Sequence, residues 1–186
     1  MNLFERIIAA RAGGAVERCH GIPHATSYSN AKHQWGVAML LMQLFPADFP
    51  RLVSYALTHD VPEAWVGDIP SPTLTHNPEF RASINRLESH IFNRLHLPDL
   101  HALNAQDMKI IKSCDALELW IWCNEQLVIG NYFAEDVKTE LETYFGPNGE
   151  NLLPPACKFY LQGKTDLRKF IARQAGVMRE VSDVAE

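Results

Sequence analysis

The spacing of apolar residues constrains the fold of this chain more than any other feature. Phe80, Ile84 and Leu87, for example, follow one another at intervals of three and four. This spacing places side chains on one face of an α-helix, whereas a half-buried strand alternates every second residue. Alternation sustained over four or more residues is scarce in the sequence. The pattern therefore predicts an all-α protein.

Glycine and proline residues divide this pattern into helices whose ends are predicted to within about two to four residues. The stretches with helical period are about 3–11, 31–45, 51–59, 78–95, 104–129, 134–145 and 165–181. Asn2 is a typical N-cap for the first of them. Pro62 lacks a backbone N–H and fits the first turn of a further, short helix. Breaker residues predict loops at 67–72 and 146–155.

The chain length of 186 residues indicates a single domain over residues 1–186, with about seven or eight helices. At this size roughly 68–70% of the surface of the unfolded chain becomes buried, so the core needs no metal or disulfide to form. Trp120 and Trp122 lie on either side of Ile121. We therefore expect at most one of these tryptophans to face the core.

Charge and composition exclude several classes of protein. The formal net charge of −5 argues against a protein that coats a nucleic acid polymer, which needs a basic stripe. A nucleotide substrate stays open, because a local metal ion can outweigh the global charge. The N-terminus lacks the pattern of a signal peptide, and no apolar run approaches the ~20 residues of a membrane span. We expect a cytoplasmic protein, or one of the host cytoplasm if the chain is viral, with no membrane partner.

Four residues on three predicted helices are candidate metal ligands, namely His33, His59, Asp60 and Asp115. A carboxylate buried alone is costly, so Asp115 needs a partner or a metal in its apolar surroundings. Two imidazoles and two carboxylates make a mixed nitrogen and oxygen site that suits zinc, cobalt, manganese or iron. The alternative reading pairs Asp115 with Lys112 and leaves the histidines as ordinary core or surface residues.

Short motifs follow one another in a specific order. They are Arg18, Lys32-His33, His59-Asp60-Val61-Pro62-Glu63, Asp68-Ile69-Pro70-Ser71-Pro72 and Ser113-Cys114-Asp115-Ala116-Leu117. The set resembles the HD-domain phosphohydrolase superfamily, and within it the bacterial 5′-deoxynucleotidases and the phage deoxynucleoside triphosphate triphosphohydrolases. The resemblance covers about residues 15–131, which would form an HD core. It implies an HD-type helical bundle with further C-terminal helices in residues 132–186.

The resemblance implies roles for the acidic and histidine residues of these motifs. His33, His59, Asp60 and Asp115 would be the metal ligands. Glu63 would serve in proton transfer, and Asp68 would contact the sugar or help to position the nucleophile. On local grounds alone, Glu63 is a carboxylate favoured in a first helical turn, and Asp68 is a common turn residue.

The resemblance also implies a substrate site. Arg18 would hold the 5′-phosphate, although a surface charge is the alternative reading for Arg18. Lys112 or Lys32 would help to neutralise the remaining charge of the phosphate. Ile22 is our candidate for a wall that selects the sugar or the base, unless its loop only links two helices. The chain has Cys19 where the family has an aromatic residue, and Lys32 where the family has glutamate.

The activity implied is divalent-metal-dependent hydrolysis of 2′-deoxynucleotides at the 5′-phosphate end. A monophosphate would give nucleoside and phosphate, and a triphosphate such as dATP would give nucleoside and triphosphate. The metal would be zinc, cobalt or manganese, with magnesium as an alternative, and the protein would be a homo-oligomer. Two rival functions are an alarmone-type nucleotide hydrolase and a non-catalytic HD signalling module. Alarmone hydrolases commonly carry adjacent Glu-Asp after the His-Asp pair, whereas Glu63 is followed by Ala64.

Overall fold

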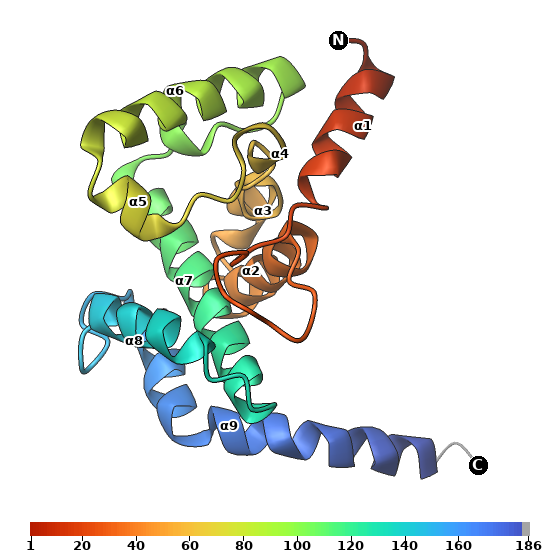
Figure 1. Cartoon of the computed structure of the whole chain (residues 1–186), viewed down its shortest axis with the longest axis vertical. Coiled ribbons are helices and arrows are strands. Elements are labelled where there is room, and N and C mark those ends of the chain that lie inside the picture. The colour runs from red at the N-terminus through yellow and green to blue at the C-terminus, as the bar shows by residue number, and fades with distance from the viewer. Residues whose placement is uncertain (184–186) are drawn as a thin grey trace. The chain divides into compact units, whose positions relative to one another are not determined.

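The computed structural model describes the backbone of residues 1–183 and the side chains of residues 1–171 and 173. Within that part of the chain the regular structure is helical, apart from one isolated β-bridge between Glu17 and Ser29. The all-α prediction is confirmed. The elements in chain order (Figure 1) are α1 Leu3–Gly13, α2 Asn30–Leu44, α3 Phe49–Thr58, α4 Glu63–Val66, α5 Ser71–Thr75, α6 Pro78–Leu95, a 3-10 turn Leu100–Ala102, α7 Ala105–Val128, α8 Ala134–Phe145 and α9 Pro154–Asp183.

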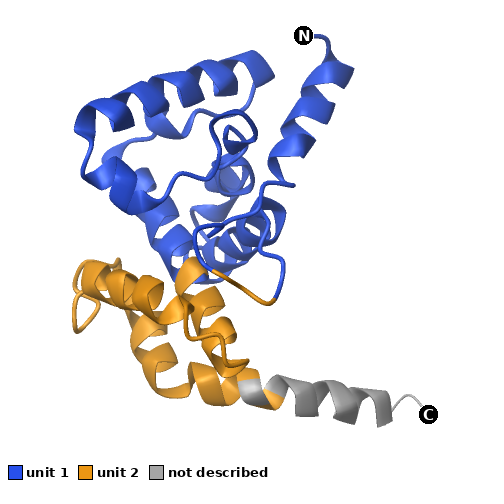
Figure 2. Ribbon diagram, in the orientation of Figure 1, with its two compact units in different colours: residues 1–22, 26–118 blue, residues 23–25, 119–186 orange. Residues whose placement is uncertain are grey.

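The contacts within the chain divide it into two compact units (Figure 2). The first unit holds Met1–Ile22 and Thr26–Glu118, and the second holds Pro23–Ala25 and the chain from Leu119 onward. Helix α7 therefore contributes to both units. The expectation of one domain over residues 1–186 stays a prediction. None of the helices described here is both long and apolar enough to cross a membrane.

Local signals set many of the helix ends. The Asn2 side chain accepts a hydrogen bond from the Glu5 N–H at 2.9 Å, and the Glu5 carboxylate accepts one from the Asn2 N–H at 2.8 Å. This capping box satisfies two N–H groups that the start of a helix leaves without partners, so α1 begins at Leu3 as predicted. Helices α6 and α8 run over the predicted residues 78–95 and 134–145.

Two loop predictions are wrong in part. The predicted loop 146–155 ends early, because α9 begins at Pro154 and not at the predicted residue 165. Likewise, α5 begins at Ser71 inside the predicted loop 67–72, with Pro72 in its first turn. Proline is tolerated in the first turn because the N–H it lacks would have no helical acceptor there. In both places proline starts a helix where we had expected it to break one.

Both tryptophans of α7 are buried, with relative exposures of 1% each, so the expectation that at most one faces the core is wrong. Two positions apart on a helix, their side chains point about 200° away from each other. The Trp120 ring packs against Tyr160 of α9 at a centroid distance of 5.3 Å, and the Trp122 ring packs against His24 at 5.6 Å. This part of α7 is therefore covered on opposite sides.

The core of the first unit fixes three helices, of which α2 and α7 carry candidate ligands and α3 leads directly into His59 and Asp60. Buried apolar side chains of these helices include Val37 and Leu41 of α2, Leu52 and Ala56 of α3, and Ile111 and Leu117 of α7. Each fully buried valine, leucine or isoleucine side chain contributes about 1.5–3 kcal/mol relative to exposure. This packing holds polar side chains on the same helices in fixed positions.

Candidate metal centre

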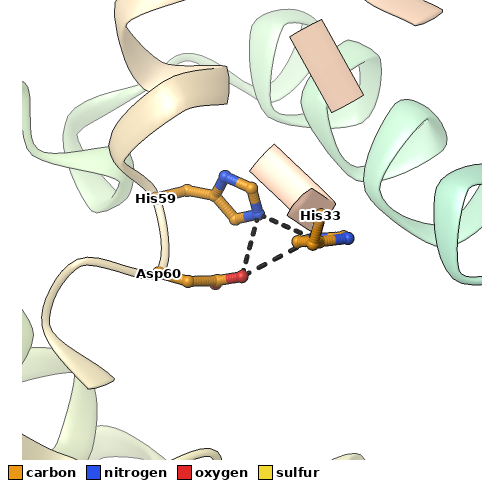
Figure 3. A group of neighbouring side chains, drawn as sticks. All are labelled: His33, His59 and Asp60. Atoms are coloured by element: carbon orange, nitrogen blue, oxygen red, sulfur yellow. Dashed lines mark hydrogen bonds and ion pairs between the residues drawn. The ribbon is translucent and has the colours of Figure 1, made fainter. Parts of the chain in front are cut away.

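Two histidine rings lie edge-on to each other inside the first unit, with their centroids 5.2 Å apart. His33 lies in the first turn of α2, and His59 directly follows α3. Their Nε2 atoms are 3.2 Å apart, and both side chains are almost completely buried. Asp60 Oδ2 lies 3.2 Å from Nε2 of His59 and 3.5 Å from Nε2 of His33 (Figure 3). These three residues place their ligand atoms close enough together to hold one metal ion.

Each histidine is held through its other ring nitrogen. His59 Nδ1 lies 2.9 Å from the carbonyl oxygen of Ala56, and His33 Nδ1 lies 2.5 Å from Oε2 of Glu118. Both partners accept hydrogen bonds, so each Nδ1 acts as the donor. In its neutral form, which metal binding requires, each ring then has a lone pair on Nε2 that is directed toward the other ring. Two Zn–N bonds of about 2.0–2.1 Å at a tetrahedral angle separate their nitrogens by about 3.3 Å, close to the distance seen here.

Asp115 approaches the same histidines from α7. Its Oδ1 atom lies 3.0 Å from Nε2 of His33 and 3.9 Å from Nε2 of His59. Its Oδ2 atom accepts a hydrogen bond from Nζ of Lys112 at 2.8 Å. Burial raises the pKa of Asp115, but Lys112 and the histidines outweigh burial and hold that pKa well below its usual range. Asp115 therefore pairs with Lys112 through one carboxylate oxygen, as in the alternative interpretation of the sequence. Its other oxygen lies beside the candidate ligands His33 and His59.

Arg18 is a buried cation at this site and not a surface charge. Its side chain is 11% exposed, and Nη1 donates to the carboxylate of Asp60 and, at 3.1 Å, to Oδ1 of Asn30. Nη1 also lies 3.9 Å from Oε1 of Glu63. The amide of Asn30 donates to Oε2 of Glu63 at 2.8 Å. Arg18, Asp60 and Glu63 thus form one connected charged group.

The electrostatic surroundings also shift the pKa values of Glu63 and His33. Burial and the nearby charge of Asp60 raise the pKa of Glu63 to about 8. Burial and Arg18 lower the pKa of His33, but the carboxylates of Asp115 and Glu118 outweigh them and raise it to about 9. A carboxyl group that titrates near neutral pH is well suited to proton transfer.

Asp68 is tied to the backbone beside Arg18. Its Oδ2 atom accepts a hydrogen bond from the N–H of Cys19 at 2.8 Å and lies 3.3 Å from Nδ1 of His20. Cys19 has a φ of +53°, in the left-handed region that residues with a side chain seldom adopt. Ile22 is half-buried, and its N–H donates to the carbonyl of Cys19 at 3.1 Å. Asp68 is therefore more than a turn residue, because it holds a strained backbone next to Arg18.

Two polar residues at this site carried no predicted function. Glu118 binds His33, and Asn30 joins Arg18 to Glu63. Glu118 had a signal in the sequence, since it follows Asp115 by three residues and so shares its face of a helix. A carboxylate within the apolar run of α7 also needs a partner. Asn30 had no comparable signal.

The family model and the curated relatives that match this chain are described as 5′-deoxynucleotidases. A family model described as 5′-deoxynucleotidase YfbR-like matches residues 14–147. A 5′-deoxynucleotidase of Photobacterium profundum is 28% identical over 105 residues, which cover 50% of this chain and 54% of the relative. A 5′-deoxynucleotidase of Vibrio parahaemolyticus is 27% identical over 95 residues, which cover 44% of this chain and 49% of the relative. The chain spans about half the length of the curated relatives it matches.

A solved structure shares the fold over nearly the whole chain. It is the HD phosphohydrolase DatZ of cyanophage S-2L, bound to dA and one catalytic Zn²⁺ ion. The match has a TM-score of 0.66 at 19% sequence identity and covers 91% of this chain and 98% of DatZ. This match confirms the predicted HD-type helical fold.

Proposed function

Because the chain belongs to the YfbR-like 5′-deoxynucleotidase family, we propose that it is a divalent-metal-dependent hydrolase that cleaves 2′-deoxynucleotides at the 5′-phosphate. One observation carries the proposal. The Nε2 atoms of His33 and His59 meet at 3.2 Å beside two carboxylates, while both Nδ1 atoms are bound elsewhere. Two imidazole lone pairs directed at one point in a buried site are typical of a metal centre.

The donor set fits a transition metal. His33, His59, Asp60 and Asp115 would supply two nitrogen and two oxygen ligands, which suit zinc, cobalt or manganese better than magnesium. DatZ, which has the same fold, holds one catalytic Zn²⁺ ion, and this supports zinc as the first metal to test. When bound, the metal would supply a water of pKa near ~7 and would draw charge from a phosphoryl oxygen.

The other charged residues would handle the proton and the phosphate. Glu63 would take the proton of the attacking water and return it to the 5′-oxygen as the P–O bond breaks, so one water is consumed per nucleoside released. Arg18 would offset the charge of the phosphate, since phosphoryl transfer depends mainly on positioning and electrostatic stabilisation. Asp68 would hold the backbone at Cys19 and so place Arg18. Lys112 would act chiefly on Asp115, because its Nζ already donates there.

The family description supports a deoxynucleoside 5′-monophosphate as substrate, and the dA bound to DatZ supports adenine as a base to test. A deoxynucleoside triphosphate, such as dATP, is the second candidate. Ile22 remains our candidate for the residue that selects the sugar or the base. We propose that the partners of the protein are the deoxynucleotide and further copies of this chain, and that it binds no nucleic acid polymer. We also propose that it acts in the cytoplasm. Sedimentation of the purified protein measures the oligomeric state.

A substrate panel tests the proposal. The full chain is loaded with Zn²⁺, Co²⁺, Mn²⁺ or Mg²⁺ and given deoxynucleoside mono- and triphosphates, the matching ribonucleotides and guanosine tetraphosphate. Chromatography resolves the products. We expect deoxynucleoside together with phosphate or triphosphate. Stoichiometric metal without turnover of any deoxynucleotide would overturn the proposed activity, and turnover of the alarmone alone would favour the rival hydrolase.

A further inference from the structure

We infer that Glu118 is a positioning residue, which holds His33 in the Nδ1–H form and so directs its Nε2 lone pair at the metal. Glu118 would not itself be a ligand. The inference rests on the proposed function, since it requires a metal at His33. It concerns a residue on α7 that belongs to none of the motifs described above.

The geometry places Glu118 on the far side of the His33 ring from the metal. Its Oε2 atom lies 2.5 Å from Nδ1 of His33, whereas Asp60 and Asp115 approach Nε2. The hydroxyl of Tyr28 donates to the same Oε2 atom and lies 3.2 Å from Nδ1 of His33. His33 and Tyr28 are fully buried, and Glu118 is 8% exposed. A carboxylate oxygen that only accepts fixes the proton of the ring on Nδ1.

The backbone of α2 leaves room for this contact. Gly36 lies one helical turn after His33, and a Cβ atom at Gly36 would lie 2.6 Å from Cγ of Glu118. Glycine is unfavourable inside a helix relative to alanine. A glycine in α2 beside the Glu118 side chain is therefore consistent with a contact that the site requires.

A carboxylate that accepts a hydrogen bond from a metal-bound histidine strengthens the binding of the metal. A hydrogen bond from Nδ1–H to a carboxylate orients the ring and makes Nε2 a stronger ligand. Loss of this kind of partner lowers metal affinity by about 10–100-fold. A buried carboxylate that served only to stabilise the fold would affect the melting temperature and leave metal affinity unchanged.

The test compares zinc affinity in two matched variants of the full chain. Glu118→Gln keeps the side-chain volume but removes the charge, and competition with a chelator measures the Kd for Zn²⁺. We expect a Kd about 10–100-fold above that of the unmodified protein. The control is Asp107→Asn, which removes another buried carboxylate of α7, one that Arg51 pairs with away from the ligands. Its zinc affinity should be unchanged. Equal zinc affinity in Glu118→Gln and the unmodified protein would overturn the inference.

A second measurement uses the unmodified protein and so does not depend on whether a variant folds. Nitrogen NMR of the zinc-loaded protein should show His33 with its proton on Nδ1 and Nε2 bound to the metal. Coordination through Nδ1 would overturn the inference. The outcomes also separate the two proposals. A protein that binds zinc but releases no product contradicts the proposed activity alone, and one that binds no metal contradicts the metal centre itself.

Discussion

Oδ1 of Asp115 lies 3.0 Å from Nε2 of His33, although α2 and α7 are far apart in the sequence. Lys112 holds the other oxygen of this carboxylate at 2.8 Å. The carboxylate is thereby fixed between a cation and an imidazole, and only one of its oxygens is directed at the histidines. A single ligand atom is thus available to a metal from α7.

The first prediction concerns these ligands. We expect Asp115→Ala and His59→Ala to lose bound metal and at least ~10²-fold in turnover, because each change removes one of the four proposed ligands and so weakens metal binding. The far-UV circular dichroism should stay helical, since the apolar core of the first unit is untouched. Elemental analysis of the purified variants measures the metal. Stoichiometric metal in both variants would rule out this ligand set.

The second prediction concerns Glu63. Glu63→Gln should keep the metal and the hydrogen bond with Asn30 but lose ~10²–10⁴-fold in kcat, because the amide cannot carry the proton. Glu79→Gln is the matched control, since Glu79 is also an acidic residue in a first helical turn, that of α6. Single-turnover kinetics with the zinc-loaded proteins give the rates. A kcat near that of the unmodified protein would remove Glu63 from the reaction.

Local signals explain how much of the fold could be predicted from the sequence. Helix α6 starts with a proline at its first position, and α8 ends at Gly146, which has a φ of +81°. These signals lie within a few residues of the helix ends, so the ends of α6 and α8 could be predicted from the local sequence alone. The candidate ligands His33, His59, Asp60 and Asp115 were named together because the motifs resemble those of the family, and their role as metal ligands stays a prediction.

Long-range contacts explain what could not be predicted. Glu118 and His33 are 85 residues apart, so nothing near Glu118 in the sequence shows which ring it binds. The burial of both Trp120 and Trp122 has the same cause. It depends on Tyr160 and His24, which come from other parts of the chain. Periodicity shows that a helix has an apolar face, but the number of buried faces depends on its neighbours.

The third prediction is a pH dependence of stability in the metal-free protein. Burial and Asp60 raise the pKa of Glu63 to about 8 in the folded state, from an ordinary value of 4.5. The folded state therefore binds more protons than the unfolded state between these values, and stability falls as pH rises through them. Glu63→Gln removes this titration. With a chelator present, the melting temperature of the unmodified protein should fall relative to that of Glu63→Gln between pH 5 and pH 8. A constant difference would contradict the raised pKa.

The fourth prediction concerns Gly36. Replacing a helical glycine by alanine ordinarily stabilises a helix by about 1 kcal/mol. At Gly36 the new Cβ would lie 2.6 Å from Cγ of Glu118, and overpacking of a core costs typically 1–3 kcal/mol. We therefore expect Gly36→Ala to lower the melting temperature and to weaken zinc binding, because Glu118 must move away from His33. Thermal melts and zinc titrations measure the two effects, and a stabilised variant with unchanged zinc affinity would contradict the expectation.

The last prediction separates two roles for Asp68. If Asp68 acts by holding the Cys19 N–H at 2.8 Å, Asp68→Ala should release the left-handed backbone at Cys19 and displace Arg18. The KM for the nucleotide should then rise about 10-fold or more, with the metal content unchanged, since a left-handed residue with a side chain costs roughly 1–2 kcal/mol. Glycine adopts this conformation without that cost, so Cys19→Gly in the Asp68→Ala background should recover part of the loss. Steady-state kinetics of the two single variants and the double variant measure the coupling. A double variant no better than Asp68→Ala would instead assign Asp68 a direct contact with the sugar or the nucleophile.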